Sequence, residues 1–141
     1  MVIRLVSPSL SRREIAAVRL AMEGVQHGWH TDELAARVGV TRAHLSVLLR
    51  ARGLPSAGHL LTWARMLHAG RWLMDPGRTA ESVSRQLSYS NGSAAFRRAL
   101  RNYVGATPTQ LIEGGGLVRV LERFVKACDL SVPPRAFRSV A

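Results

Sequence analysis

The stretch that decides the fold is residues 31–45, which read TDELAARVGVTRAHL. Leu34 and Val38 lie at the spacing of one apolar helix face, and Gly39 follows them as a residue that commonly ends a helix. Thr41 then predicts the N-cap of another helix. A short helix, a small turn residue and a capped second helix together predict a helix-turn-helix unit.

The same pattern returns further along the chain. Each copy has a short helix, a small turn residue, an apolar turn residue and a hydroxyl side chain at the next N-cap. At a constant offset of 49 positions, Ala35, Gly39, Val40 and Thr41 are followed by Ser84, Ser88, Tyr89 and Ser90. Two copies in one basic chain predict a duplicated helix-turn-helix.

The rest of the chain also has helical rather than strand periodicity. We expect an amphipathic helix at about residues 11–26 and a connecting helix that keeps its apolar spacing from Leu60 to Leu73. We expect Gly105 and the Thr107-Pro108 pair to end the last reader helix. Further N-caps are predicted at Thr31, Ser56, Thr79 and Ser90.

The predicted fold class is therefore all-α, with two helix-turn-helix subdomains joined by a long helix. The expected parts are a first subdomain at 8–55, a connecting helix at 56–75, a second subdomain at 76–112 and a C-terminal part at 113–141. The C-terminal part holds a triple glycine, an amphipathic stretch at 117–129 and a basic tail with Arg135 and Arg138.

The charge balance favours a nucleic-acid partner. The chain has 20 Lys+Arg against 9 Asp+Glu, a formal net charge of +11, and every one of those cations except Lys126 is arginine. The planar guanidinium suits paired contacts to phosphate and guanine. Residues 76–112 carry five arginines against Glu81, and residues 8–55 carry seven arginines against four acids. Binding through such a surface should depend steeply on salt.

Several other classes of protein find no support. No apolar run is long enough to span a bilayer, and residues 1–10 are too weakly patterned for a secretory signal. Cys128 is the sole cysteine, so we expect no intramolecular disulfide, no cysteine zinc cluster and a reducing cytoplasm. The five histidines are scattered along the chain rather than clustered with other ligand residues, so no metal, cofactor or catalytic site is predicted. They are His27, His30, His44, His59 and His68.

Several motifs resemble the DNA-binding domain of the AraC/XylS family. Residues 34–35 and 39–45 resemble the family's first unit, and residues 65–66 and 69–73 resemble its connecting helix. The most specific match is the closing signature, FRRALR at 96–101 followed by GATP at 105–108. The resemblance implies a bacterial transcription regulator on the nucleoid. It would insert two recognition helices into successive major-groove segments of double-stranded DNA, and RNA polymerase would be a further partner.

The resemblance also assigns candidate DNA-binding residues. In the first unit the groove-facing set would be Arg42, Ala43, Ser46, Val47 and Arg50. The family usually has arginine at the place of Val47, so we expect this unit to position the protein more than it specifies sequence. In the second unit the set would be Asn91, Ser93, Ala94, Arg97, Arg98 and Arg101.

Within the second unit, Arg97 and Arg98 would read bases and Arg101 would hold phosphate. Helix N-termini at Thr31, Thr41 and Ser90 would offer further seats for phosphate. Ser88 replaces the usual turn glycine, and the span from Tyr89 to Phe96 is one residue longer than the family pattern. The register of the second recognition helix stays open, with Asn91, Gly92 and Ser93 in either a loop or the first turn.

The sequence leaves two questions open, the function of the chain and the role of residues 117–129. The chain could be a helical protein-interaction adaptor that binds DNA without sequence preference, which the weak first unit and Ser88 favour. The stretch 117–129 either packs on the second unit, which we expect, or exposes Leu117 and Phe124 to a partner. The expected state is thus a monomer or a weak dimer through 117–129. Trp63, Trp72 and Cys128 are expected to pack in the interior.

Overall fold

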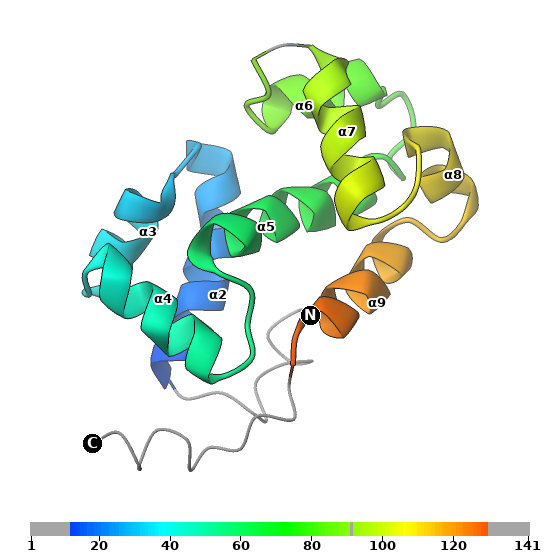
Figure 1. Ribbon diagram of the computed structural model, residues 1–141. Coiled ribbons are helices and arrows are strands. Elements are labelled where there is room, and N and C mark those ends of the chain that lie inside the picture. The colour runs from blue at the N-terminus through cyan, green and yellow to red at the C-terminus, as the bar shows by residue number, and fades with distance from the viewer. Residues whose placement is uncertain (1–11, 91, 130–141) are drawn as a thin grey trace. The chain divides into compact units, whose positions relative to one another are not determined.

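The computed structural model describes residues 12–90 and 92–129, and every regular element in those ranges is helical (Figure 1). This confirms the all-α prediction. The chain divides into two units, one with the described residues up to Leu61 and from Val125 onward, the other with Thr62–Phe124. The boundaries fall inside helix α5 (Ala57–Trp72) and helix α9 (Leu117–Ala127). The functional division expected from the sequence stays a prediction. It comprises a first subdomain at 8–55, a connecting helix at 56–75, a second subdomain at 76–112 and a C-terminal part at 113–141.

In its described residues, the first unit contains three complete helices, one short 3-10 turn, the first part of α5 and the end of α9. Helix α2 (Arg12–Gly24) runs into the turn η2 (Val25–His27), and α3 (Thr31–Val38) and α4 (Arg42–Ala51) follow. Helix α3 packs against both α2 and α4, as Figure 1 shows. Their facing side chains are almost fully buried: Ala17, Val18, Ala21, Leu34, Ala35, Leu45 and Leu49. Each large apolar side chain contributes roughly 1.5–3 kcal/mol by burial.

A buried ion pair ties the two ends of this unit together. Arg52, directly after α4, places its Nε 3.7 Å from Oε1 of Glu14 in the first turn of α2, and both side chains are buried. Oε2 of Glu14 has no hydrogen-bond partner. Since a buried charge is tolerated only when it is paired, removal of one partner should cost far more than a surface ion pair is worth.

The predicted N-cap at Thr31 is wrong by one residue. His30 has the extended backbone of an N-cap, and Thr31 is the first residue of α3. The backbone N–H of His30 donates to Oε2 of Glu33 at 3.0 Å, so the Glu33 side chain in the first turn caps the N-terminus of α3. The phosphate seat expected at Thr31 therefore cannot rest on a capping hydroxyl.

The second unit is built from the rest of the chain. It contains α5 from Thr62 onward, α6 (Ala80–Gln86), α7 (Ser93–Tyr103), α8 (Pro108–Glu113) and the first part of α9. Its core side chains are 0–1% exposed: Met66, Val83, Leu87, Phe96, Leu100, Leu111, Val120 and Phe124. The predicted cap at Thr79 is confirmed, because its hydroxyl accepts the N–H of Ser82 at 3.0 Å.

The tryptophans of α5 are core residues, as predicted. Trp63 is 6% exposed and meets the rings of Tyr103 and Phe124 edge-on, at centroid distances of 5.2 and 5.7 Å. Trp72 is 9% exposed, and the guanidinium of Arg78 lies 5.5 Å from its ring centroid. Neither ring is available as a stacking platform for bases.

Helix α8 was not predicted. Thr107-Pro108 does end the preceding segment, but it also begins a new helix with Pro108 in the first turn. The Thr107 hydroxyl accepts the N–H of Gln110 at 3.1 Å, and the Gln110 side chain accepts the N–H of Thr107 at 3.0 Å. This reciprocal capping box explains why so short a helix forms.

The expectation that residues 117–129 pack on the second unit is confirmed for residues 117–124 of α9, whereas the residues from Val125 onward belong to the first unit. Val120 and Phe124 are 0% and 1% exposed. A Cβ added to Gly70 of α5 would lie 3.0 Å from the Cα of Leu117, so glycine at this position permits the close approach of the two helices. Cys128, just after α9, is also buried. The basic tail with Arg135 and Arg138, like residues 1–11, lies outside the described residues.

Candidate nucleic-acid interface

The two helix-to-helix turns share the same backbone geometry. Gly39 and Ser88 both have positive φ, 88° and 67°. The next residue in each turn donates its N–H back to the helix: Val40 to the carbonyl of Ala35, and Tyr89 to that of Ser84, both at 3.0 Å. These bonds satisfy carbonyls at a helix end. The repeat seen in the sequence is thus a repeat of hydrogen bonding, at the same offset.

After the turn the two units differ in length. Helix α4 begins directly after Thr41, whose Oγ1 accepts the N–H of His44 at 3.1 Å, so that predicted cap is confirmed. Ser90 is not the cap of α7: the N-cap is Gly92, with φ of 65°, and Ser93 is the first helical residue. Asn91 lies outside the described residues. The repeat offset of 49 therefore predicts the wrong residue as the N-cap of α7, and the phosphate site expected at Ser90 has no helix N-terminus there.

The buried residues of α4 and α7 set the register of the second helix. Leu45 and Leu49 correspond to Phe96 and Leu100, all 0% exposed, at an offset of 51 rather than 49. The second turn is therefore two residues longer than the first. By this register, Arg97 corresponds to Ser46, Arg98 to Val47 and Arg101 to Arg50.

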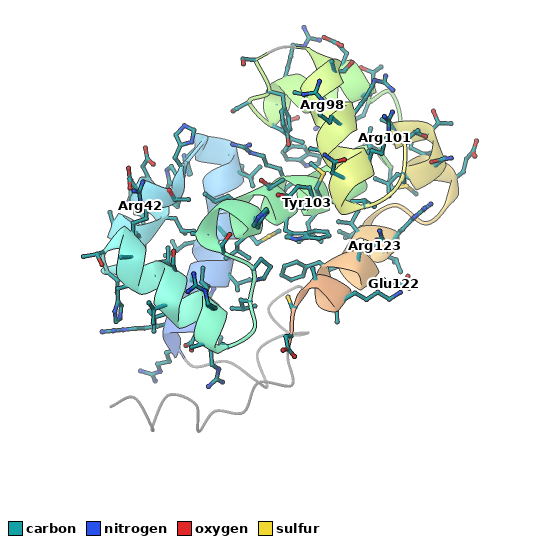
Figure 2. The ribbon with its side chains drawn as sticks, viewed as in Figure 1. Arg42, Arg98, Arg101, Tyr103, Glu122 and Arg123 are labelled. Carbon is teal, nitrogen blue, oxygen red and sulfur yellow. The ribbon has the colours of Figure 1, made fainter. Side chains whose placement is uncertain are left out.

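Helix α4 presents a mixed surface opposite its core face. Arg42, Ala43 and Arg50 are exposed, Val47 is 55% exposed and Ser46 is half-buried. Arg42, labelled in Figure 2, pairs with Asp32 of α3 at 3.4 Å, and both side chains are largely exposed. A valine at the centre of this face can touch a thymine methyl group but can donate no hydrogen bond to a base.

Helix α7 presents an arginine face. Ala94, Arg97, Arg98 and Arg101 are exposed, and Ser93 and Ala95 are half-buried. Nε of Arg97 donates to Oγ of Ser93 one turn earlier, at 3.3 Å. Arg98 and Arg101 extend from the same helix in Figure 2. Where α4 has a serine and a valine, α7 therefore has two exposed guanidinium groups suited to paired contacts with guanine.

An aromatic contact that the sequence pattern did not reveal anchors the second turn. The ring of Tyr89 lies 5.8 Å from that of Phe96, and the guanidinium of Arg65 lies 5.4 Å from the Tyr89 centroid. Burial raises the pKa of Tyr89, and the neighbouring Arg65 partly opposes this shift. The turn is therefore held on the connecting helix from inside, which leaves the arginine face of α7 outward.

Residues 12–90 and 92–129 contain neither a metal-ligand cluster nor a membrane-spanning helix. No group of three or more His, Cys, Asp or Glu in that part of the chain is placed to hold a metal ion. In the same ranges, no helix combines the length and apolarity needed to cross a membrane.

The fold and surface define a class: a double helix-turn-helix protein in which the second helix of the second unit, α7, is strongly cationic. The model of a helix-turn-helix domain family of AraC type matches residues 34–114, more than half of the chain. The chain belongs to this family, whose function is DNA-binding transcription regulation. No curated protein and no solved structure matches the chain significantly.

Proposed function

We propose that the chain is a sequence-specific regulator that binds double-stranded DNA with α4 and α7 in successive major-groove segments. The observation that carries this proposal is the outward face of α7. Arg97, Arg98 and Arg101 are exposed there, and Phe96 and Leu100 hold the opposite face in the core. A helix of this kind fits a major groove about 12 Å wide.

The two helices take unequal parts. Arg97 and Arg98 read bases, and each paired contact with guanine discriminates by about 1–3 kcal/mol. Arg101 holds phosphate. In α4, Arg42 and Arg50 bind phosphates of the DNA backbone. Ala43, Ser46 and Val47 contribute only van der Waals contacts in the groove. Specificity then comes mainly from the second unit, and the first acts as a clamp.

Phosphate contacts at helix N-termini are retained in part. The capped N-terminus of α4 at Thr41 has free backbone N–H groups that suit a phosphate. Thr31 contributes its own backbone N–H as the first residue of α3. The binding partner would be double-stranded DNA of the bacterial nucleoid in the cytoplasm, and regulation could include contact with RNA polymerase. No catalytic step and no cofactor is part of this function.

Selection from random-sequence duplexes by the full chain tests the proposal. We expect a recovered motif that the chain binds at least about a thousandfold more tightly than random duplex at physiological salt. The rival function, a helical interaction adaptor, is favoured by the exposed Val47 and the strained Ser88. It predicts no recovered motif and a salt dependence that is the same for every duplex.

A further inference from the structure

The exposed arginine face of α7 is followed by a glycine, Gly105. Arg97 and Arg101 are four residues apart, so they lie one above the other on one face. Gly105 comes four residues later, and its N–H donates to the carbonyl of Arg101 at 3.0 Å. Gly105 therefore lies one turn beyond Arg101 in line with the arginine face, and it leaves space there because it has no side chain.

Two arginines from α9 reach that place. Nη2 of Arg119 donates to the carbonyl of Gly105 at 3.4 Å. A Cβ added to Gly105 would lie 3.2 Å from Nη2 of Arg123, so this guanidinium occupies the space that a side chain at 105 would need. Arg119 and Arg123 are themselves one turn apart on α9, and Arg123 is exposed. Figure 2 shows Arg101 on α7 and Arg123 on α9.

The packing of α9 fixes these side chains in position. Val120 and Phe124 are buried in the second unit, which turns the positions of Arg119 and Arg123 away from the core. Guanidinium groups also interact favourably with the negative end of a helix dipole, which explains why they gather at the C-terminus of α7. Each retains further N–H donors beyond the contact at Gly105.

We infer that Arg119 and Arg123 bind DNA phosphates, so that the backbone-binding surface of α7 extends onto α9. With Arg97 and Arg101 they form one cationic stripe. The residues that match the family end at 114, so these two contacts are an addition to the family's domain. The inference deepens the proposed function and rests on it for the placement of α7 in the groove.

The test is a salt titration of DNA binding by the full chain. Each phosphate contact contributes about 0.9 to the slope of log affinity against log salt. Arg119→Gln/Arg123→Gln should therefore lower the slope by about 1.8, with roughly eightfold weaker binding per contact at about 0.1 M salt. The same loss is expected on random and selected duplexes, because phosphate contacts carry no sequence information. Arg119→Lys/Arg123→Lys should keep most of the slope.

Arg71→Gln removes one exposed arginine of α5 outside the stripe, so it is the charge-matched control for the single variant Arg123→Gln, which should lower the slope by about 0.9. The slope of Arg71→Gln should equal that of the unmodified chain, and an equal drop there would overturn the inference in favour of a net-charge effect. An unchanged slope in the double glutamine variant, with or without a lower melting temperature, would also overturn it and leave only a role in capping α7.

Failure of the proposed function looks different. If the unmodified chain selects no motif but the double variant still loses about 1.8 in slope on random duplex, specificity fails and the phosphate contacts stand.

Discussion

Ser88→Gly should stabilise the protein, because Ser88 is a non-glycine residue at a turn position that requires positive φ. Its φ is 67°, and the equivalent residue of the first unit is Gly39, with φ of 88°. The left-handed conformation costs a residue with a Cβ roughly 1–2 kcal/mol. Glycine regains this but gives up about 0.4–1 kcal/mol through the greater freedom of the unfolded chain. The net gain in the free energy of unfolding is about 0.5–1 kcal/mol.

The chain provides its own controls. Gly39→Ser should destabilise by about the same amount, since a Cβ there meets no atom within 4 Å and only the backbone strain counts. Ser88→Ala keeps the Cβ and should change little. Thermal and urea unfolding followed by circular dichroism should place Ser88→Gly about 2–4 °C above the unmodified chain. A gain in Ser88→Ala equal to that in Ser88→Gly would refute the strain argument.

Three further predictions concern single features of the fold. Arg52→Met should lower the free energy of unfolding by about 3–5 kcal/mol, because it leaves the buried Glu14 carboxylate without its partner. In urea titrations, the double variant Glu14→Leu/Arg52→Met should recover most of that loss. Equal stability of the single variant and the unmodified chain would contradict this. Thr107→Ala removes the cap of α8 and should cost about 1 kcal/mol by the same assay, and no loss would mean that packing alone holds the helix. Burial raises the pKa of the Cys128 thiol from 9.0 to about 11. Alkylation at pH 8 should therefore be about 100-fold slower in the folded chain than in denaturant and rise about tenfold per pH unit. The contribution of this buried neutral thiol to the free energy of unfolding is fully present below pH 9 and is lost as pH rises through about 11. Alkylation of the folded chain at pH 8 as fast as in denaturant would contradict the burial of Cys128.

The sequence was sufficient for the features that depend on local chemistry. Thr41 and Thr79 cap helices because each hydroxyl reaches an N–H three residues ahead. Gly39 marks its turn because the turn needs positive φ. The arginine face of α7 follows from helical spacing once Phe96 and Leu100 are placed inside.

The sequence-based errors arose where two local signals competed. Ser90 is a good cap by type, but Gly92 adopts the positive φ that ends the longer turn, so α7 begins two residues later than the repeat offset predicts. The Thr107-Pro108 pair predicts the end of a helix, but in the structure the same pair also begins α8. The Glu14–Arg52 pair joins residues 38 positions apart, so no local pattern could reveal it.

The arginines of α9 form a second class of feature that lay beyond local patterns. Arg119 and Arg123 have helical spacing in the sequence, but their approach to Gly105 depends on how α9 packs. The sequence could therefore identify a helix with two cations, but only the structure shows that both lie at the C-terminal end of α7.

The most direct test of the account is duplex selection with two charge-matched variants, Arg97→Ala/Arg98→Ala and Arg42→Ala/Arg50→Ala. The first should abolish or relax the recovered motif at the bases read by α7, at about 1–3 kcal/mol for each lost contact. The second should weaken binding to all duplexes alike and leave the motif intact. A motif that survives loss of Arg97 and Arg98, or disappears with Arg42 and Arg50, would contradict the assignment of sequence reading to α7.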